Sequence, residues 1–132
     1  MINSRTKGAS AEREISKLLY DELGIKLVRN LEQSRSGGHD LIPDKDSLLD
    51  AFAIEVKRYA NVSTAQLKGF WRQTMIQAIR ANKIPVLMYR QDRCDWLAVV
   101  PLHVINSDLS TSNCFDSVAI LNLSAFCAVV RG

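Results

Sequence analysis

A short apolar stretch that carries two charges constrains the fold of this chain more than any other segment. Residues 51–56 read Ala-Phe-Ala-Ile-Glu-Val, and Lys57 follows. A β-strand over residues 51–58 puts Glu55 and Lys57 on one face, because alternate residues of a strand share a face. Ile54 then points to the opposite face. A strand this apolar is expected to be buried, and buried charges need a partner or a metal ion.

The same Glu-x-Lys spacing also occurs in exposed strands, where the two charges only pair with each other. The preceding segment Gly37-Gly38-His39-Asp40 favours a metal site instead. If Asp40 lies on a neighbouring strand or turn, its carboxylate and that of Glu55 meet where a hard divalent cation can bind through oxygen. With the Lys57 amine alongside, such a set suits phosphodiester hydrolysis. His39 touches this site in sequence, although a histidine in a Gly-rich turn is usually solvated or locally bonded.

Length and composition predict a single compact domain over residues 1–132. The chain is 47% hydrophobic and 23% charged, without repeats or low-complexity segments. It has no signal-peptide pattern and no apolar run of the ~20 residues that a bilayer span needs, so we expect a cytoplasmic protein. Three cysteines without C-x-x-C spacing are expected to be buried free thiols rather than zinc ligands.

Charge is unevenly distributed along the chain, whose net charge is +3. Residues 57–93 hold eight Lys or Arg and one acid, whereas residues 36–56 hold five acids and one lysine. Cations beside a carboxylate pocket suit a polyanion such as DNA, although a solvated helix face is the ordinary alternative. The residues that we expect to contact DNA are Arg5, Lys7, Arg13, Arg29, Arg35, Arg58, Lys68, Arg72 and Arg80.

Hydrophobic periodicity predicts alternating helices and strands, which indicates an α/β fold. Helices are expected over residues 9–23 and from 61–64 to about 82, and strands over 25–31, 40–42, 51–58, 85–90 and 95–100. Residues 43–50 read as a hairpin loop with solvated acids, and residues 101–112 as a helical turn and loop. The apolar tail 118–130 is expected to complete the core or to cover a partner subunit.

Polar residues on the two long helices supply further candidates. Glu12 lies ~55° from the centre of the apolar stripe of the first helix, so it faces inward, unless it only complements the helix dipole. On the second helix Gln66, Gln73, Gln77 and Arg80 share one line. Gln73 is the candidate that could bond water or phosphate, while a solvated glutamine face is the ordinary alternative. Trp71 is assigned to the core, and Trp96 is expected to pack on this helix.

Three separated segments together resemble the PD-(D/E)xK nucleases. They are Lys7-Gly8-Ala9-Ser10-Ala11-Glu12-Arg13-Glu14, Ser36-Gly37-Gly38-His39-Asp40-Leu41 and Ile54-Glu55-Val56-Lys57. The first is most similar to archaeal Holliday-junction resolvases and related phage endonucleases. His39 stands where the family motif has proline. The resemblance covers residues 5–100 and implies a restriction-endonuclease-like αβββαβ core, with a central mixed sheet flanked by helices.

The resemblance also implies roles for individual residues. Asp40, Glu55 and the Val56 carbonyl would ligate Mg²⁺, for which Mn²⁺ can substitute. Lys57 would orient or deprotonate the attacking water, and Glu12 would assist from the first helix. Gln73 is carried over as a further catalytic candidate. By the same analogy the partner is DNA, and the protein can form a symmetric homodimer.

Three functions are compatible with these residues. The leading hypothesis is a Mg²⁺-dependent DNA endonuclease, with branched DNA such as the Holliday junction as one candidate substrate. The alternative is a nucleic-acid-binding module that keeps the fold without turnover, because fold does not guarantee function. A third hypothesis is a metal-dependent enzyme acting on a small phosphorylated molecule, for which no Gly-rich phosphate loop is present.

Overall fold

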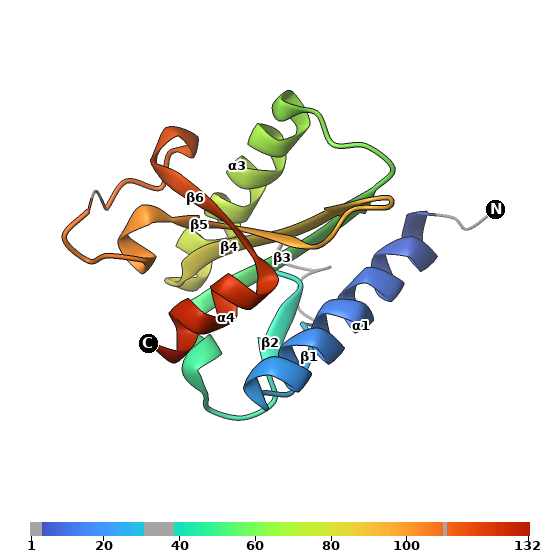
Figure 1. The fold of residues 1–132 in the computed structure, drawn as a ribbon, viewed down its shortest axis with the longest axis horizontal. Coiled ribbons are helices and arrows are strands. Elements are labelled where there is room, and N and C mark those ends of the chain that lie inside the picture. The colour runs from blue at the N-terminus through green and yellow to red at the C-terminus, as the bar shows by residue number, and fades with distance from the viewer. Residues whose placement is uncertain (1–3, 31–38, 110) are drawn as a thin grey trace.

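The computed structural model describes residues 4–30, 39–109 and 111–132, which form a six-stranded mixed sheet with helices on both faces (Figure 1). In chain order the elements are α1 (Ser4–Leu23), β1 (Leu27–Arg29), β2 (Leu41–Pro43), η1 (Leu48–Ala51), β3 (Phe52–Tyr59), α3 (Thr64–Ala81), β4 (Ile84–Gln91), β5 (Leu97–Pro101), η2 (Leu102–Val104), η3 (Phe115–Ser117), β6 (Val118–Asn122) and α4 (Leu123–Arg131). Within these ranges no helix combines the length and the apolar character that a membrane span needs.

The strands lie side by side in chain order, from β1 to β6. Strands β3 and β4 run parallel and are joined by α3, whereas all other neighbours are antiparallel. The order α1, β1, β2, β3, α3, β4 is the αβββαβ arrangement, so the predicted restriction-endonuclease-like α/β fold is confirmed. Its parallel β3–α3–β4 unit brings the C-terminal ends of β3 and β4 to the same edge of the sheet.

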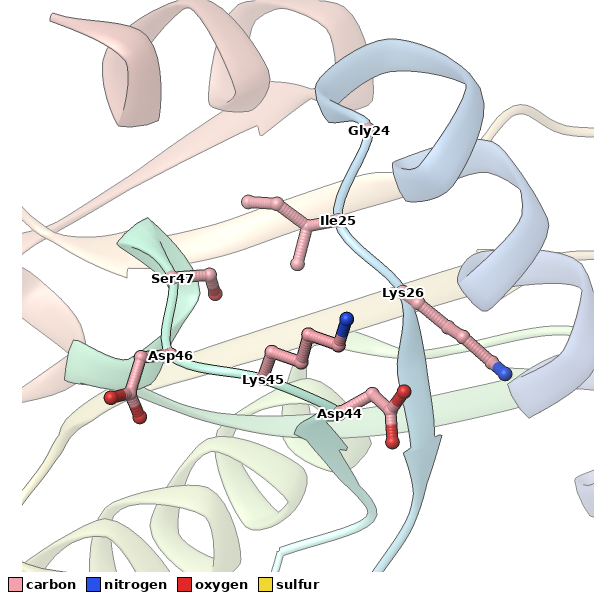
Figure 2. Close-up of a pocket in the computed structure, with 7 residues that line it drawn as sticks. All are labelled: Gly24, Ile25, Lys26, Asp44, Lys45, Asp46 and Ser47. Atoms are coloured by element: carbon pink, nitrogen blue, oxygen red, sulfur yellow. The ribbon is translucent and has the colours of Figure 1, made fainter.

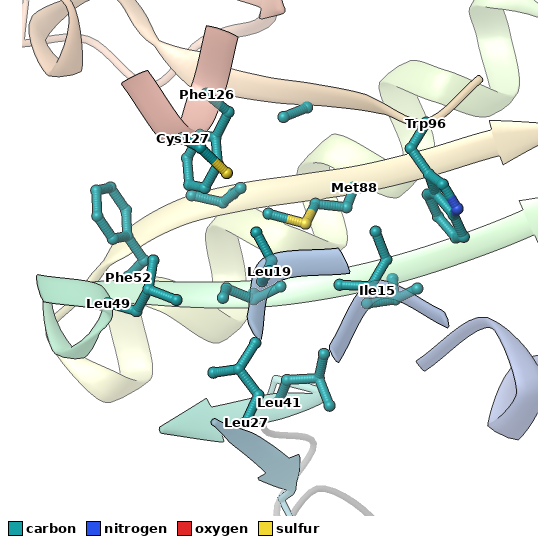
Figure 3. Close-up of a cluster of buried hydrophobic side chains, with 14 of the residues drawn as sticks. Ile15, Leu19, Leu27, Leu41, Leu49, Phe52, Met88, Trp96, Phe126 and Cys127 are labelled. Carbon is teal, nitrogen blue, oxygen red and sulfur yellow. The ribbon is translucent and has the colours of Figure 1, made fainter. Parts of the chain in front are cut away.

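Helices α1 and α4 cover one face of the sheet and bury the larger core (Figure 3). Ile15 and Leu19 from α1 and Phe126 from α4 are fully buried there. The Phe126 ring meets that of Phe52 edge to face, with centroids 5.8 Å apart. The apolar tail of the chain therefore completes the core, one of the two roles predicted for it.

Helix α3 covers the opposite face and builds a smaller cluster with Leu87, Tyr89 and Val99. Trp71 is fully buried in this cluster, as predicted, and its indole Nε1 donates to the Asn113 carbonyl at 2.6 Å. The prediction that Trp96 packs on this helix is wrong. Trp96 belongs to the core beneath α1, because it has the same strand parity as Ala98, which faces that side.

Two other predictions are corrected by burial. Gln77 is only 7% exposed, whereas a line of glutamines is typical of a solvated helix face. It lies beside buried Thr74 and Ala78 on α3. Only Cys127 is a buried thiol, whereas Cys94 and Cys114 are exposed because both lie in loops outside the strands.

A capping box fixes the start of α3. The Ser63 side chain accepts from the Gln66 amide at 3.1 Å, and the Gln66 side chain accepts from the Ser63 amide at 2.8 Å. Ser63→Ala should therefore lower the free energy of unfolding by about 1 kcal/mol. Urea denaturation followed by circular dichroism measures this change. Thr64→Ala, one residue further on and exposed, is the matched control; equal stability of the two variants would contradict the capping role.

Candidate active site

Asp40 makes two hydrogen bonds to strand β3, one to the residue before Glu55 and one to the residue after it. Its amide donates to the Ile54 carbonyl at 2.9 Å, and its Oδ2 accepts from the Val56 amide at 2.7 Å. The first bond continues the β2–β3 ladder, whose last partners are Leu41 and Ile54. Beyond that pair the carboxylate replaces a backbone partner. The structure thus places Asp40, itself buried, directly beside Glu55.

Glu55 is only 3% exposed, a setting that disfavours the charge of its carboxylate. Burial raises the pKa of Glu55 to about 8, helped by the negative charge of Asp40 and a hydrogen bond with it, while Lys57 partly offsets the effect. Glu55 Oε2 is buried and has no hydrogen-bond partner within the described residues. Two adjacent, buried carboxyl groups therefore share one site.

Lys57 lies on the same face of β3 as Glu55, as strand parity predicts. Its Nζ is 3.4 Å from Glu55 Oε1, and its side chain is 19% exposed. The ammonium also lies over the ring of Phe70 from α3, 5.5 Å from the centroid. One positive charge is thereby held at the edge of the carboxyl pair.

Glu12 faces inward from α1, as its position on the apolar stripe predicts, and is buried. Burial and the charge of Asp40 raise the pKa of Glu12, whereas Arg29 lowers it. Arg29 Nε lies 2.7 Å from Glu12 Oε2 in an ion pair. Glu12 is thus close enough to Asp40 to interact electrostatically, but it already has a cationic partner.

The acids do not form a three-ligand cluster. Across residues 4–30, 39–109 and 111–132, no three His, Cys, Asp or Glu side chains are arranged to hold a metal ion. The donors that remain are the Asp40 and Glu55 carboxylates and main-chain oxygens. A buried carboxylate oxygen without a partner, next to a second carboxylate, matches the oxygen ligands that a hard divalent cation takes. The residues present therefore fit a hard divalent cation.

Gln73 is exposed on α3. It lines a groove of about 420 Å³ together with other residues of the same helix. These are Gly69, Arg72, Ile76, Gln77 and Arg80. The groove unites two of the predicted DNA-contacting arginines with Gln73, and it also receives the buried Gln77.

The other predicted basic residues are spread over both faces. Arg13 is exposed on α1 and donates to Ser10 Oγ. Arg58 lies 4.0 Å from Glu14 and 3.8 Å from Asp92, and Lys68 is exposed on α3. The side chains of Arg5, Lys7 and Arg35 lie outside the described part of the chain.

Sequence reasoning missed the network around Glu14. Glu14 Oε1 accepts from Arg90 Nη1 at 2.6 Å and from Trp96 Nε1 at 2.8 Å. Arg90 is the register partner of Arg58 in the parallel β3–β4 pair, so two arginines stand side by side on the α1 face. No local pattern indicates this contact, because 76 residues separate Glu14 from Arg90.

His39 is buried rather than solvated. Neither ring nitrogen has a hydrogen-bond partner among the residues that the structure describes. Burial lowers the pKa of His39, and the charge of Lys83 lowers it further. The lowered pKa favours the neutral form of this imidazole, which is next to Asp40 in the chain.

A second pocket, of about 520 Å³, lies at the other end of β2 from Asp40 (Figure 2). It is formed by the end of α1, the start of β1 and the segment after β2. Its charged lining residues balance, with two lysines, Lys26 and Lys45, and two aspartates, Asp44 and Asp46. It contains none of the predicted site residues and gives no preference for an anion or a cation.

A family match over most of the chain shows the class of protein to which it belongs. Residues 3–125 match the family described as phage putative PDDEXK endonuclease. The chain therefore belongs to that family, and the predicted resemblance to PD-(D/E)xK nucleases is confirmed.

Two individual proteins show the range of similarity. Protein D14 of Escherichia phage T5 is 24% identical over 111 residues, which cover 73% of this chain and 69% of that protein. Hjc of Archaeoglobus fulgidus, a Holliday junction resolvase from an archaeal hyperthermophile, is similar in structure with a TM-score of 0.48 and 16% identity. That similarity covers 91% of this chain and 87% of Hjc.

Proposed function

We propose that this chain, as one nuclease domain, is a Mg²⁺-dependent endonuclease that hydrolyses phosphodiester bonds in DNA. The observation that carries the proposal is the buried Glu55 carboxyl beside Asp40, with one oxygen unpartnered among the described residues. Such a pair is unfavourable in the metal-free protein and favourable around a divalent cation. Membership of a nuclease family supports the same chemistry.

The Val56 carbonyl is the third proposed ligand. Within a strand the N–H and C=O groups of one residue point to the same side. Because the Val56 amide donates to Asp40, its carbonyl also points toward Asp40 and away from β4. The β2–β3 pairing ends two residues earlier, at Ile54, so this carbonyl is not taken up by a ladder partner on β2.

Lys57 supplies a fixed positive charge at the site. A divalent cation, when bound, would neutralise phosphate oxygens and lower the pKa of a water. Lys57 would stabilise the negative charge that develops on the phosphate and orient the attacking water through its ammonium donors. Glu12, which is paired with Arg29, would influence the site through its electrostatic interaction with Asp40. Gln73 remains a candidate for contact with the substrate from the α3 groove.

Basic side chains would hold the DNA backbone around this site. Arg72 and Arg80 line the α3 groove on one side, and Arg58 follows Lys57 on the other. Contacts of this kind are made to phosphates and confer no sequence preference. Four-way junctions are one candidate substrate. A symmetric dimer, which would supply two active sites for a double cut, is part of the proposal.

Cleavage of a panel of DNA substrates tests the proposal. Purified protein is incubated with supercoiled, linear, single-stranded and four-way-junction DNA, in Mg²⁺, Mn²⁺ or EDTA. Cleavage that is lost in EDTA and in Asp40→Ala supports the enzyme. Salt-sensitive binding to DNA without cleavage in any metal would favour the non-catalytic binding module instead.

Glu12→Gln is expected to slow cleavage by about tenfold and not to abolish it. Glu12 acts on Asp40 through space and is already paired with Arg29, and groups of this kind typically change activity by 10–100-fold. Single-turnover cleavage at saturating Mg²⁺ measures the rate. Asp21→Asn on the same helix, an exposed residue paired with Lys17, is the control. Equal rates for both variants would remove Glu12 from the site.

A further inference from the structure

The ring of Phe70 contacts two side chains that leave the same face of β3. Lys57 Nζ lies 5.5 Å from the ring centroid, and the Tyr59 ring stacks on Phe70 with centroids 5.2 Å apart and planes at 18°. Lys57 and Tyr59 are two residues apart and therefore share a face. An aromatic side chain from α3 thus meets the ammonium of the proposed active site.

Phe70 is partly buried. It packs against the α3-side cluster that contains Leu67 and Trp71, and its carbonyl accepts from Thr74 Oγ1 at 2.8 Å. Trp71, the next residue, is anchored through its indole to Asn113. The stacked Tyr59 ring covers part of the ring surface. A ring fixed in this way can define the place of a flexible side chain that lies on it.

Two attractions act on the Lys57 ammonium. One is Glu55, whose Oε1 lies 3.4 Å from Lys57 Nζ, and the other is the negative face of the Phe70 ring. The side chain is only 19% exposed, so water supplies little of its solvation. Lysine has a flexible four-carbon stem, and without such contacts its ammonium would sample several positions.

The carboxylate alone is a weak anchor under the proposed function. If Glu55 ligates a divalent cation, its charge is shared, and the cation also repels the nearby ammonium. The ring is neutral and takes no part in ligation, so its attraction for Lys57 persists. Phe70 is therefore the contact that can keep the ammonium in place when the metal site is filled.

We propose that Phe70 is a positioning residue for Lys57, holding the ammonium in line with the phosphate to be cleaved. This inference rests on the proposed nuclease function. Phe70 would not touch the reacting atoms. Its effect should appear in the turnover rate rather than in DNA affinity, because displacement of a catalytic group by about 1 Å can cost up to a hundredfold in rate.

The contact has a spectroscopic signature that does not depend on activity. In protein labelled with ¹³C at the lysine Cε, the Lys57 signal should lie upfield of exposed lysines, because it sits over an aromatic face. Its assignment follows from its loss in Lys57→Arg. Phe70→Leu should move this signal to the position of exposed lysines, whereas Phe70→Tyr and Phe70→Trp should keep it upfield.

Phe115 offers a matched control, because its ring carries Lys68 Nζ at 5.9 Å on the same side of the sheet. Phe115→Leu should move the Lys68 signal and leave that of Lys57 unchanged. Thermal denaturation of each variant verifies that the fold is retained. An unchanged Lys57 signal in folded Phe70→Leu would overturn the proposal.

Cleavage then tests the consequence of the contact. In single-turnover assays at saturating DNA and Mg²⁺, Phe70→Leu should lower the rate by about tenfold or more, with little change in the Kd for DNA. Phe70→Tyr and Phe70→Trp should restore most of the rate, and Phe115→Leu should cleave like the wild type. A wild-type rate in Phe70→Leu would overturn the positioning role. If the wild-type protein cleaves no DNA, the nuclease proposal itself fails, and the lysine spectrum still reports whether Phe70 holds Lys57.

Discussion

Asp40→Asn is expected to lower metal-dependent cleavage by about a thousandfold or more while leaving the fold intact. The side-chain oxygen of asparagine can still accept from the Val56 amide, so the strand contact survives. The negative charge that would hold a divalent cation is lost, and charge stabilisation by such a cation contributes several kcal/mol to phosphoryl-group reactions. This variant should thus lose cleavage activity and keep its stability.

Three measurements test this expectation. Single-turnover cleavage gives the rate, isothermal titration with Mn²⁺ gives metal binding, and thermal denaturation gives stability. The metal-free variant should be at least as stable as the wild type, because Asp40 no longer repels Glu55 and Glu12. Asp44→Asn, an exposed acid just beyond β2, is the control and should cleave normally. Cleavage by Asp40→Asn within tenfold of the wild type would exclude Asp40 as a ligand.

The metal-free protein should lose stability as the pH rises from about 5 to about 8. The pKa of Glu55 is raised from 4.5 to about 8 in the folded protein. Between these values the folded state binds a proton that the unfolded state has released, so the free energy of unfolding falls with increasing pH. The loss is complete above about pH 8 and is of the order of a few kcal/mol.

Urea denaturation at a series of pH values in EDTA measures this slope. Glu55→Gln cannot titrate at this position and should show a flatter profile. Addition of Mg²⁺ at pH 8 should restore stability to the wild type and not to Glu55→Gln, because a ligand that binds only the folded state stabilises it. A flat wild-type profile in EDTA would mean that the Glu55 carboxylate is not disfavoured by its surroundings.

Local rules were sufficient for most of the fold. Helical periodicity and turn residues predict both long helices and five of the six strands, and strand parity alone puts Glu55 beside Lys57. No element was predicted in the apolar tail 118–130, which forms β6 and α4. Parity does not say which helix covers which face. Trp96 was therefore assigned to the wrong helix, although its alternation with Ala98 was visible in the sequence.

The geometry of the candidate site depends more than the fold does on contacts between residues that are far apart in the sequence. Nothing in the periodicity of residues 39–43 predicts that Asp40 bonds to Val56, and only the motif resemblance brought these residues together. The partners of Glu12 and Glu14, Arg29 and Arg90, are set by sheet order and register. The line of polar residues on α3 does not indicate which of its glutamines is covered by the rest of the protein. Gln77 is buried, whereas Gln73 is exposed.

The two hydrogen bonds that Asp40 makes to β3 depend on the correct alignment of β2 with β3. Its amide donates to the Ile54 carbonyl and its carboxylate accepts from the Val56 amide, so the two bonds lie on either side of Glu55. A slip of β2 by one residue would turn the aspartate to the opposite face and separate the two acids completely. Assembly of the proposed cation-binding pair is therefore the same event as correct strand alignment, and misaligned molecules should be inactive rather than partly active.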